Sequence, residues 1–454
     1  MAVGRGAALL LLAALPACAL PDGSRGLPRG LPAPPDAALP LREKARLLEE
    51  DLGRLHLLPW GTLAYSVRLP EDPGGVPGVA YVADQGAWGG VLLAAEAERF
   101  AATGDPEALE RVRALLGGLT ALTAVTGERG FYARFACPRG FVPREPHPRR
   151  WRDGAPGWEG WRWRGDVSKD QAAGIVCGLS AVGDLVPDPP CRERAARLLG
   201  DLADRLLGRG GIWEDGDGRP TTYGDIRPRV YGVPVGVNAA IALGLADAAS
   251  RATGEPRHRR MLEALVEGGA CEALRYPTLR VFGKEGWSNV NMDAMALASI
   301  LRRPPREGDA AAAHLRSAAE ESMRRILALH RGEGNAFWIA VAAPAGEAAG
   351  ATARDLEDAQ CQLGRYPLDR ATRRIDHSGR TDLPRAWWNT KSGKPQFAAP
   401  LPVDLQGAGS FVWKSNPYEI LQEEGGDGRT VYAGTDFLAA YWPLRRLGVL
   451  RPEE

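Results

Sequence analysis

The 454-residue chain has few cysteines, no excess of charge of either sign and no long apolar run beyond its N-terminus. Its 57 Lys and Arg against 56 Asp and Glu leave a formal charge of +1. That balance argues against a nucleic-acid partner, because a basic surface supplies most of the affinity for nucleic acid. No internal stretch approaches the roughly 18 to 20 apolar residues of a membrane-spanning helix. Six cysteines are too few for a disulfide scaffold of this length.

Several catalytic motifs are also missing. The chain contains no HExxH motif, no CxxC pair and no serine-centred GxSxG turn. Zinc-dependent hydrolysis and serine esterase chemistry therefore have no local support. We expect no cofactor and no metal ion. Cys177 lies in an apolar helical segment, where it is expected to act as a small apolar residue.

The N-terminus reads as a targeting segment. Arg5 precedes the apolar run 7–15, which is long enough for a signal peptide and too short to span a membrane. The run ends in Leu15-Pro16-Ala17-Cys18, which resembles a bacterial lipobox with Cys18 as the lipidated residue. The alternative is an ordinary signal peptide cleaved near the same position.

The lipobox interpretation places the protein in the cell envelope. By analogy with lipoproteins, Ala19 after the cysteine indicates anchoring in an outer membrane, facing the periplasm or the cell surface. The expected membrane contact is then the lipid on Cys18. Residues 1–18 form the signal peptide, and the Pro- and Gly-rich segment 19–40 is expected to be an extended tether.

The rest of the chain reads as pairs of unequal helices. One member of each pair carries almost no charge, as in 171–183, 233–246 and 288–300, and a helix apolar on all sides is buried. The other member is amphipathic, as in the segments after Asp105, Cys191 and His314. We expect inner helices to begin near residues 84, 168, 234, 287 and 433, with a more charged candidate near 351.

Short turns alternate with long loops, which favours a closed ring over an open solenoid of helix pairs. Thr103-Gly104-Asp105, for example, ends one helix at Gly and restarts the next with an acid. The amphipathic segment 42–54 is expected to pair with 434–447 and close the ring. The sequence therefore predicts an all-α protein, a single (α/α)6 toroid over residues 41–450 with long loops on one face, and a monomer.

Tryptophans gather in the long loops. Four of the 13 Trp lie in the loop before the second inner helix: Trp151, Trp158, Trp161 and Trp163. Indole rings stack on sugar rings and line clefts, although they also pack loops onto a barrel rim. We expect a substrate-binding surface that includes Trp88, Trp163, Trp213 and Trp287.

Aspartates mark the starts of the inner helices. Glycoside hydrolysis needs two carboxylates, one protonated as an acid and one acting as base or nucleophile. Asp and Ser at a helix start also serve as N-caps, worth about 1 kcal/mol, and Asp166 or Ser168 could do only that. Our candidates for catalysis, in order of preference, are Asp170, Asp84, Asp293 and Asp166.

Three further polar residues are candidates for substrate binding. A lyase acting on an acidic polysaccharide would use Tyr or His together with Arg, and Tyr223, His377 and Arg134 have the required side chains. His377 lies in a polar loop, Arg374-Ile375-Asp376-His377-Ser378, which is compatible with a site.

Five motifs resemble those of secreted bacterial proteins of the six-hairpin glycosidase superfamily. They lie at residues 84–88 (DQGAW), 130–134 (GFYAR), 165–171 (GDVSKDQ), 411–418 (FVWKSNPY) and 436–442 (DFLAAYW). The resemblance covers residues 80–448 and implies the (α/α)6 fold. It implies no single reaction, because the superfamily holds hydrolases, phosphorylases, lyases and members without known activity.

These observations lead to one preferred function and two alternatives. We expect an enzyme that cleaves a poly- or oligosaccharide by two-carboxylate acid/base catalysis. A polysaccharide lyase and a non-catalytic glycan-binding or scaffold lipoprotein remain open at this point.

Overall fold

The structure is a computed structural model that describes residues 27–28, 31–72, 75–142, 147–277, 286–386 and 395–453. Cys18, the predicted signal peptide 1–18 and the first part of the predicted tether 19–40 lie outside the described residues. Among the described residues, no helix combines the length and the apolar character needed to cross a membrane.

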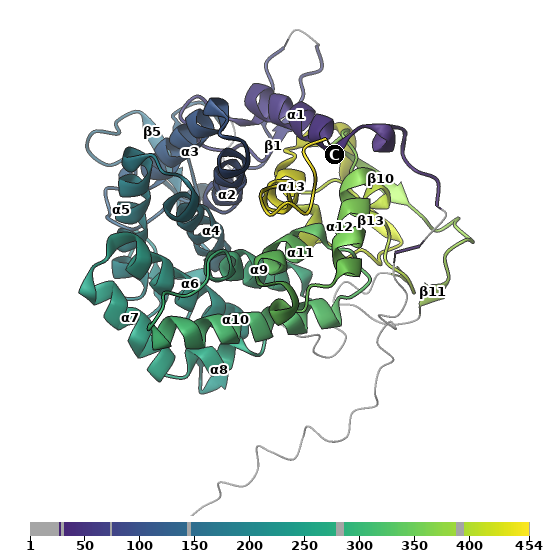
Figure 1. Cartoon of the computed structure of the whole chain (residues 1–454). Coiled ribbons are helices and arrows are strands. Elements are labelled where there is room, and N and C mark those ends of the chain that lie inside the picture. The colour runs from purple at the N-terminus through teal and green to yellow at the C-terminus, as the bar shows by residue number, and fades with distance from the viewer. Residues whose placement is uncertain are drawn as a thin grey trace, which may run out of the picture.

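Six inner helices form a closed ring in the described part of the chain (Figure 1). They are α2 (Gln85–Thr103), α4 (Lys169–Leu185), α6 (Gly236–Thr253), α9 (Trp287–Leu301), α11 (Ala336–Ala342) and α13 (Thr435–Arg446). Each packs against the next, and α13 packs back against α2. The fold is therefore the predicted toroid and not an open solenoid, because a solenoid leaves its first and last repeats apart.

An outer layer of amphipathic helices covers the ring. It consists of α1 (Leu41–Asp51), α3 (Pro106–Ala124), α5 (Pro189–Leu206), α7 (Pro256–Glu267), α8 (Ala270–Leu274), α10 (Ala310–Leu329) and α12 (Ala353–Arg365). Asp105, Asp188 and Asp309 cap α3, α5 and α10, each accepting a hydrogen bond from a backbone N–H of the first turn. Helix α1 packs on α13, which confirms the predicted closing pair.

The prediction of one inner helix, near residue 351, is wrong. The charged segment near 351 forms α12, which lies in the outer layer. The inner position belongs to α11, whose seven residues (AFWIAVA) are all buried. This helix was missed because seven residues are too short to show a helical period.

The two ends of the ring differ. At what we call the turn end, short turns such as 104–105, 186–188 and 254–255 lead from inner to outer helices. At the loop end, where the inner helices begin, longer segments such as 125–168, 207–235 and 366–434 lead back. The predicted alternation of short turns and long loops is confirmed.

The loops at the loop end carry short antiparallel strands. β10 (Ala371–Asp376), β13 (Leu421–Tyr432), β1 (Ser66–Arg68) and β2 (Gly78–Val79) form a sheet in that order. β3 (Phe135–Pro138), β5 (Trp161–Arg164) and β4 (Trp151–Asp153) form a second sheet. Three pairs complete the set: β6 (Ile212–Glu214) with β7 (Pro220–Asp225), β8 (Arg229–Val230) with β9 (Val233–Pro234), and β11 (Arg385–Ala386) with β12 (Gln396–Phe397).

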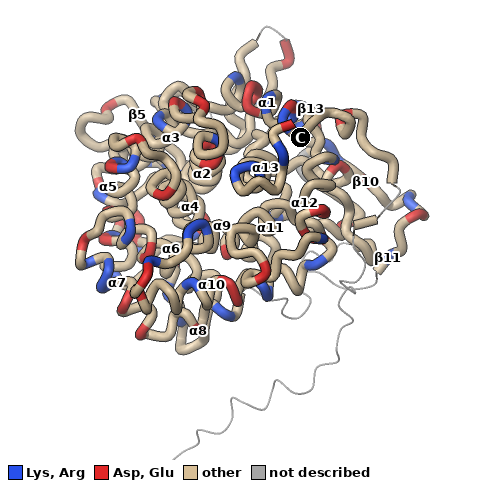
Figure 2. The backbone as a smooth tube through the Cα atoms, in the orientation of Figure 1, with Lys and Arg blue, Asp and Glu red and all other residues tan. Residues whose placement is uncertain are grey.

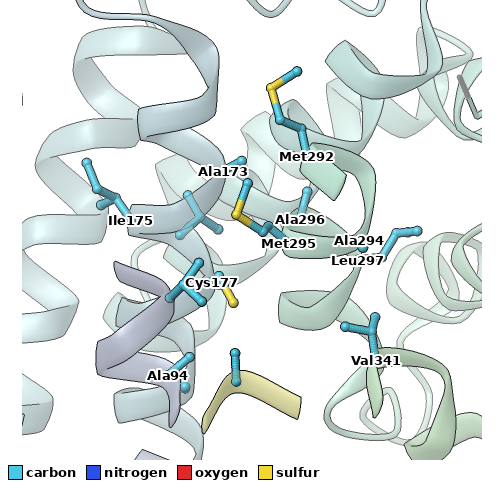
Figure 3. Packing of buried hydrophobic residues seen from close by; sticks show 14 of the residues in the cluster. Ala94, Ala173, Ile175, Cys177, Met292, Ala294, Met295, Ala296, Leu297 and Val341 are labelled. Carbon is cyan, nitrogen blue, oxygen red and sulfur yellow. The ribbon is translucent and has the colours of Figure 1, made fainter. Parts of the chain in front are cut away.

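Buried apolar side chains of the inner helices pack against one another inside the ring (Figure 3). Cys177 of α4 and Met295 of α9 lie there among alanines of the inner helices. The cavity lined by Ala94, Cys177 and Val341 is only about 30 Å³, room for one or two water molecules. This cavity therefore has no space for a molecule much larger than water. Cys177 is buried, as expected, and it forms no disulfide with any described cysteine.

The described end of the tether is docked on the ring. A 3-10 turn at Pro35–Ala38 packs against α12, and the Leu368 backbone donates to Asp36 at 2.7 Å. Arg365 of α12 donates to the carbonyl oxygen of Pro32 at 2.7 Å. The segment 19–40 is thus not extended over its whole length, because residues 32–39 have partners on the outer layer.

Candidate active site

Helices α2 and α4 cross at very close range. A Cβ atom on Gly90 would lie 2.1 Å from the carbonyl oxygen of Gly174, and a Cβ on Gly174 would lie 2.2 Å from that of Ala87. A Cβ on Gly178 would meet the carbonyl oxygen of Gly90 at 2.3 Å. Only glycine allows this approach. The crossing brings together the first turns of both helices, and with them Asp84 and Asp170.

Asp84 is held in an unusual backbone conformation directly before α2. Its φ of 55° and ψ of 26° are left-handed, a region that non-glycine residues rarely adopt. Its carboxylate accepts a hydrogen bond from the Gln171 side-chain amide at 2.8 Å and forms an ion pair with Arg134 at 2.8 Å. The side chain stays 21% exposed. The carboxylate is therefore oriented but still accessible.

Gln171 connects the two helices at this point. Its side-chain oxygen accepts from the backbone N–H groups of Gly86 and Ala87 at 3.1 and 3.3 Å, and its nitrogen donates to Asp84. One side chain of α4 thus satisfies the free N–H groups that begin α2.

The pKa of the Asp84 carboxyl is raised above the ordinary aspartate value. Burial is the largest cause, and the negative charge of Asp170 adds to it, whereas Arg134 and Lys414 oppose the shift. A raised pKa is the property that a general acid of this residue type needs near neutral pH.

Asp170 lies in the first turn of α4 and is half-buried. Within the described part of the chain, no hydrogen bond or ion pair holds its carboxylate. It is close enough to Asp84 and Arg134 to influence the pKa of each. The first two predicted carboxylates therefore lie within electrostatic range of each other. Asp84 is held by Arg134 and Gln171, whereas the Asp170 carboxylate has no hydrogen-bond or ion-pair partner among the described residues.

Asp293 of α9 is fully buried and interacts electrostatically with Lys169. Lys169 donates to the side-chain oxygen of Asn238 at 2.9 Å. Burial lowers the pKa of Lys169, and the charges of Asp225, Asp293 and Asp170 oppose that shift. The side chain of Asp293 is enclosed, and its charge acts on Lys169.

Asp166 is engaged elsewhere. It accepts from the Thr222 backbone at 2.9 Å and forms an ion pair with Arg150 at 2.7 Å. The structure gives it the role of fastening β7 to the start of α4. It is not the N-cap of α4, since Ser168 occupies that position.

The four tryptophans expected to bind substrate are buried. Trp88, Trp163, Trp213 and Trp287 are 5%, 4%, 0% and 5% exposed. Trp88 stacks on Phe411 and has the Lys414 ammonium 5.0 Å from its ring centre. This corrects the expectation of a surface made by these rings, because an enclosed ring offers no free face to a sugar.

More exposed aromatic rings lie nearby in the same loops. Trp158 and Trp161 are half-buried and pack edge-to-face with ring centres 5.0 Å apart. Trp60 joins them at 5.3 Å from Trp161. On the β1–β13 sheet, Tyr65, Tyr81 and Tyr432 lie with nearly parallel rings, and Tyr81 is 50% exposed.

Tyr223 and His377, two of the predicted substrate-binding residues, differ in their exposure to solvent. Tyr223 of β7 is 66% exposed and follows Thr222, which contacts Asp166, so it borders the start of α4. His377 is buried, and its Nε2 is 2.7 Å from the carbonyl oxygen of Leu405. It packs on Phe397 within a separate apolar cluster, which corrects its assignment to the site.

Two residues of the site were missed by the sequence analysis. Lys414 and Tyr65 both interact electrostatically with Asp84, from segments far away in the chain. Asp436 positions the Lys414 segment, since its buried carboxylate accepts from the Val412 backbone at 2.9 Å and pairs with Arg370 at 2.8 Å. The FVWK and DFL motifs carried this signal, but their contact was not visible in one sequence.

Within the described residues, no group of three or more His, Cys, Asp and Glu side chains is placed to hold a metal ion. The arrangement offers proton transfer by carboxylates, supported by the cations of Arg134, Lys169 and Lys414.

No protein-family model and no curated protein matches the chain. Solved structures with a similar course of the chain include a metagenome-derived glycoside hydrolase family 9 endoglucanase, at 12% identity and a TM-score of 0.45, covering 90% of this chain and 81% of that one. Cellobiose 2-epimerase from Spirochaeta thermophila has 18% identity and a TM-score of 0.42, covering 90% and 97%. The GH76A α-1,6-mannanase from Salegentibacter sp. has 13% identity and a TM-score of 0.31, covering 90% and 100%.

Proposed function

We propose that the protein is a glycoside hydrolase that cleaves a poly- or oligosaccharide with Asp84 and Asp170. The observation that carries this proposal is the meeting of these two carboxylates in different environments at the loop end. Asp84 is fixed by Arg134 and Gln171 and has a raised pKa, whereas Asp170 is half-buried and has no protein partner among the described residues.

The two environments suit the two roles in hydrolysis. Asp84, with its raised pKa, donates the proton to the departing sugar oxygen. Asp170 supplies the second carboxylate, acting on a water molecule or on the anomeric carbon. Arg134 and Gln171 hold Asp84 in place and thereby orient its proton.

The partly exposed rings at the loop end fit a sugar chain. Trp158 and Trp161 from one loop are half-buried, and Tyr81 from another loop is 50% exposed. Such rings stack on the C–H faces of sugars. Several separate platforms favour a polymer or long oligomer over a monosaccharide.

The decisive experiment is substitution of the two carboxylates. We expect Asp170→Asn and Asp84→Asn each to lower the release of reducing ends by about 100-fold or more, because each removes a proton-transfer group. Polysaccharide binding, followed by affinity electrophoresis on a panel of glycans, should persist in both. Asp166→Asn is the matched control, and since Arg150 occupies Asp166, its turnover should stay within about tenfold of wild type.

Three results would contradict the proposal. Full turnover in both Asp84→Asn and Asp170→Asn would exclude these residues as catalytic. Products of the wild type that absorb in the near ultraviolet would indicate a polysaccharide lyase. Binding to a glycan without release of any product would indicate a glycan-binding protein. The Arg134–Asp84 ion pair favours this second candidate, because a nearby guanidinium opposes protonation of the carboxylate.

We further propose that Cys18 is lipidated and anchors the protein in the cell envelope. The support is the Leu15-Pro16-Ala17-Cys18 sequence after an apolar run. Cys18→Ala should abolish incorporation of labelled palmitate and move the protein from the membrane to the soluble fraction. Cys361→Ala, which changes an exposed cysteine, should leave both unchanged. Labelling that persists in Cys18→Ala would refute the anchor.

A further inference from the structure

The turn end of the ring contains two adjoining cavities of about 180 and 160 Å³. The larger cavity lies between α6, α7, α9 and α10, and the smaller one lies between α4, α5 and α6. They share Arg251, Arg303, Pro304 and Arg306 as a common wall and together form the pocket described below. By the same measure one water molecule needs only about 10–15 Å³. The pocket therefore has room for a small ligand, at the opposite end of the ring from Asp84 and Asp170.

The lining of this pocket is strongly basic. It contains six arginines and three aspartates: Arg192, Arg251, Arg259, Arg303, Arg306 and Arg316 with Asp184, Asp247 and Asp309. In Figure 2 the chain is blue where it leaves α9, at the start of the turn that leads to α10. This excess is local, because the chain as a whole has a formal charge of only +1.

Three of these arginines build the walls. Arg251 is paired with Asp184 and Asp247 and donates to the Ser299 carbonyl at 2.8 Å. Arg259 is paired with Asp309 and with Glu263. Arg316 is paired with Glu320 and donates to the Leu301 carbonyl at 2.8 Å. The aspartates of the lining are thus already engaged by the arginines that hold the helices together.

The other three arginines have no such partners. Within the described part of the chain, the side chains of Arg192, Arg303 and Arg306 form no hydrogen bond and no ion pair. All three are exposed at the edge of the cavities. Pro304 and Pro305 stand between Arg303 and Arg306 and restrict the backbone of this turn.

We propose that this pocket binds a tetrahedral oxyanion, a phosphate or sulfate ester. Guanidinium groups match such oxygens with paired hydrogen bonds, and three uncommitted groups around one cavity can share a doubly charged anion. Arg251 and Arg259 offset the charge of the aspartates in the wall, which would otherwise repel the anion. The site is independent of the proposed hydrolysis, because it shares no residue with the Asp84–Asp170 pair.

Isothermal titration with inorganic phosphate at constant ionic strength tests the site. We expect saturable binding of one phosphate by the wild-type protein, and a loss of affinity of about tenfold or more in Arg303→Gln/Arg306→Gln. Arg260→Gln is the matched control, since Arg260 is exposed on α7 but does not line the pocket. Its affinity should stay within about twofold of wild type, because long-range charge is screened by salt. Equal thermal unfolding midpoints confirm that the variants fold.

Two further probes identify the source of the ester. If the ligand is a soluble ester, glucose 6-phosphate should displace phosphate from the wild-type protein. If the ligand is a lipid headgroup, the wild-type protein should sediment with phosphatidylglycerol vesicles and the double variant should not. The proposal is refuted if neither phosphate nor sulfate binds saturably to the wild type. An equal loss of affinity in Arg260→Gln would also refute it, since net charge and not the pocket would then be responsible.

Discussion

At the scale of single residues, the environment of Asp84 determines its chemistry. The same carboxyl group is shifted upward in pKa by burial and by Asp170, and downward by Arg134 and Lys414. Its protonation at a given pH is therefore a balance between enclosure and neighbouring cations. This balance can be altered at one position at a time.

Removal of Arg134 should move the pH dependence of hydrolysis. Arg134 lowers the pKa of Asp84, so Arg134→Gln should raise that pKa and shift the alkaline limb of kcat/KM upward by about one pH unit. The general acid would then stay protonated to higher pH. Arg139→Gln is the control, because Arg139 is an exposed partner of Asp153. A limb that stays in place or moves to lower pH in Arg134→Gln would mean that Asp84 is not the acid.

A buried histidine makes stability depend on pH. His56 is buried, which lowers its pKa to about 4, and its Nδ1 contacts the Ala64 carbonyl at 2.8 Å. Between its ordinary pKa of about 6.5 and about 4, the unfolded chain binds the proton and the folded chain does not. The free energy of unfolding should therefore fall by about 2 kcal/mol between pH 7 and pH 5 through this residue.

The measurement is urea unfolding at both pH values for wild type and His56→Asn. Asparagine can still donate toward Ala64 but cannot be protonated, so the variant should lose less stability on acidification. An identical pH dependence in both proteins would show that His56 does not contribute.

At the scale of elements, glycine spacing determines how close two helices come. Gly90, Gly174 and Gly178 have no side chain at the points where the α2 and α4 backbones come closest. Their small size costs helix propensity, and close backbone packing offsets that loss. The crossing also positions the first turns of α2 and α4, and with them the two carboxylates of the proposed mechanism, Asp84 and Asp170.

Gly174→Ala should destabilise the protein by about 1–3 kcal/mol, because the new Cβ would lie 2.2 Å from the Ala87 carbonyl oxygen. It should also lower hydrolysis by moving Asp170 away from Asp84. Gly183→Ala in the same helix is the control, since a Cβ there would meet no described atom of another element within 4 Å and alanine favours a helix. Chemical denaturation of both variants measures the difference. Equal effects would refute the close-crossing explanation.

At the scale of the whole molecule, the ring is fastened across its axis by buried charges. Glu98 of α2 accepts from Arg302, at the end of α9, at 3.1 Å, and it also pairs with Arg446 of α13. Glu98 and Arg302 are both buried. Three inner helices that are distant in sequence thus share one ion network at the turn end.

Breaking this network on one side should be costly. Arg302→Met leaves the buried Glu98 with less compensation and should lower the free energy of unfolding by about 3 kcal/mol. The double variant Glu98→Gln/Arg302→Met should recover part of that loss, because the buried Glu98 charge is removed together with its Arg302 partner. The recovery should be incomplete, since Arg446 loses Glu98 and Asp184 keeps only Arg251 among the described residues. Denaturant unfolding of the two single variants and the double variant completes the cycle. A double variant as unstable as the sum of the singles would contradict a direct interaction.

Much of the architecture followed from the sequence by itself. Helices without charge, such as 171–183, must be buried on all sides, and amphipathic helices after Asp105 must cover them, so the ring and its outer layer were predictable from local patterns. The closing pair of α1 and α13 followed in the same way. Asp84 was a candidate because it opens the first inner helix, and Asp170 because it lies past the N-cap of a helix almost free of charge, where a carboxylate is costly without a partner or a cavity.

Only the tertiary structure decided which of these residues meet. Glycines allow the close α2–α4 crossing that positions Asp84 and Asp170. Asp166 is instead engaged in an ion pair with Arg150. Trp213 and His377 are buried and do not contribute to a surface. Lys414 interacts electrostatically with Asp84, although the two residues are far apart in the chain. Arg251 and Arg303, also from separate segments, line the same cavity. Helical period and charge are local properties that one sequence displays. Ion pairs, buried rings and pockets depend on contacts between remote segments, which only the folded chain creates.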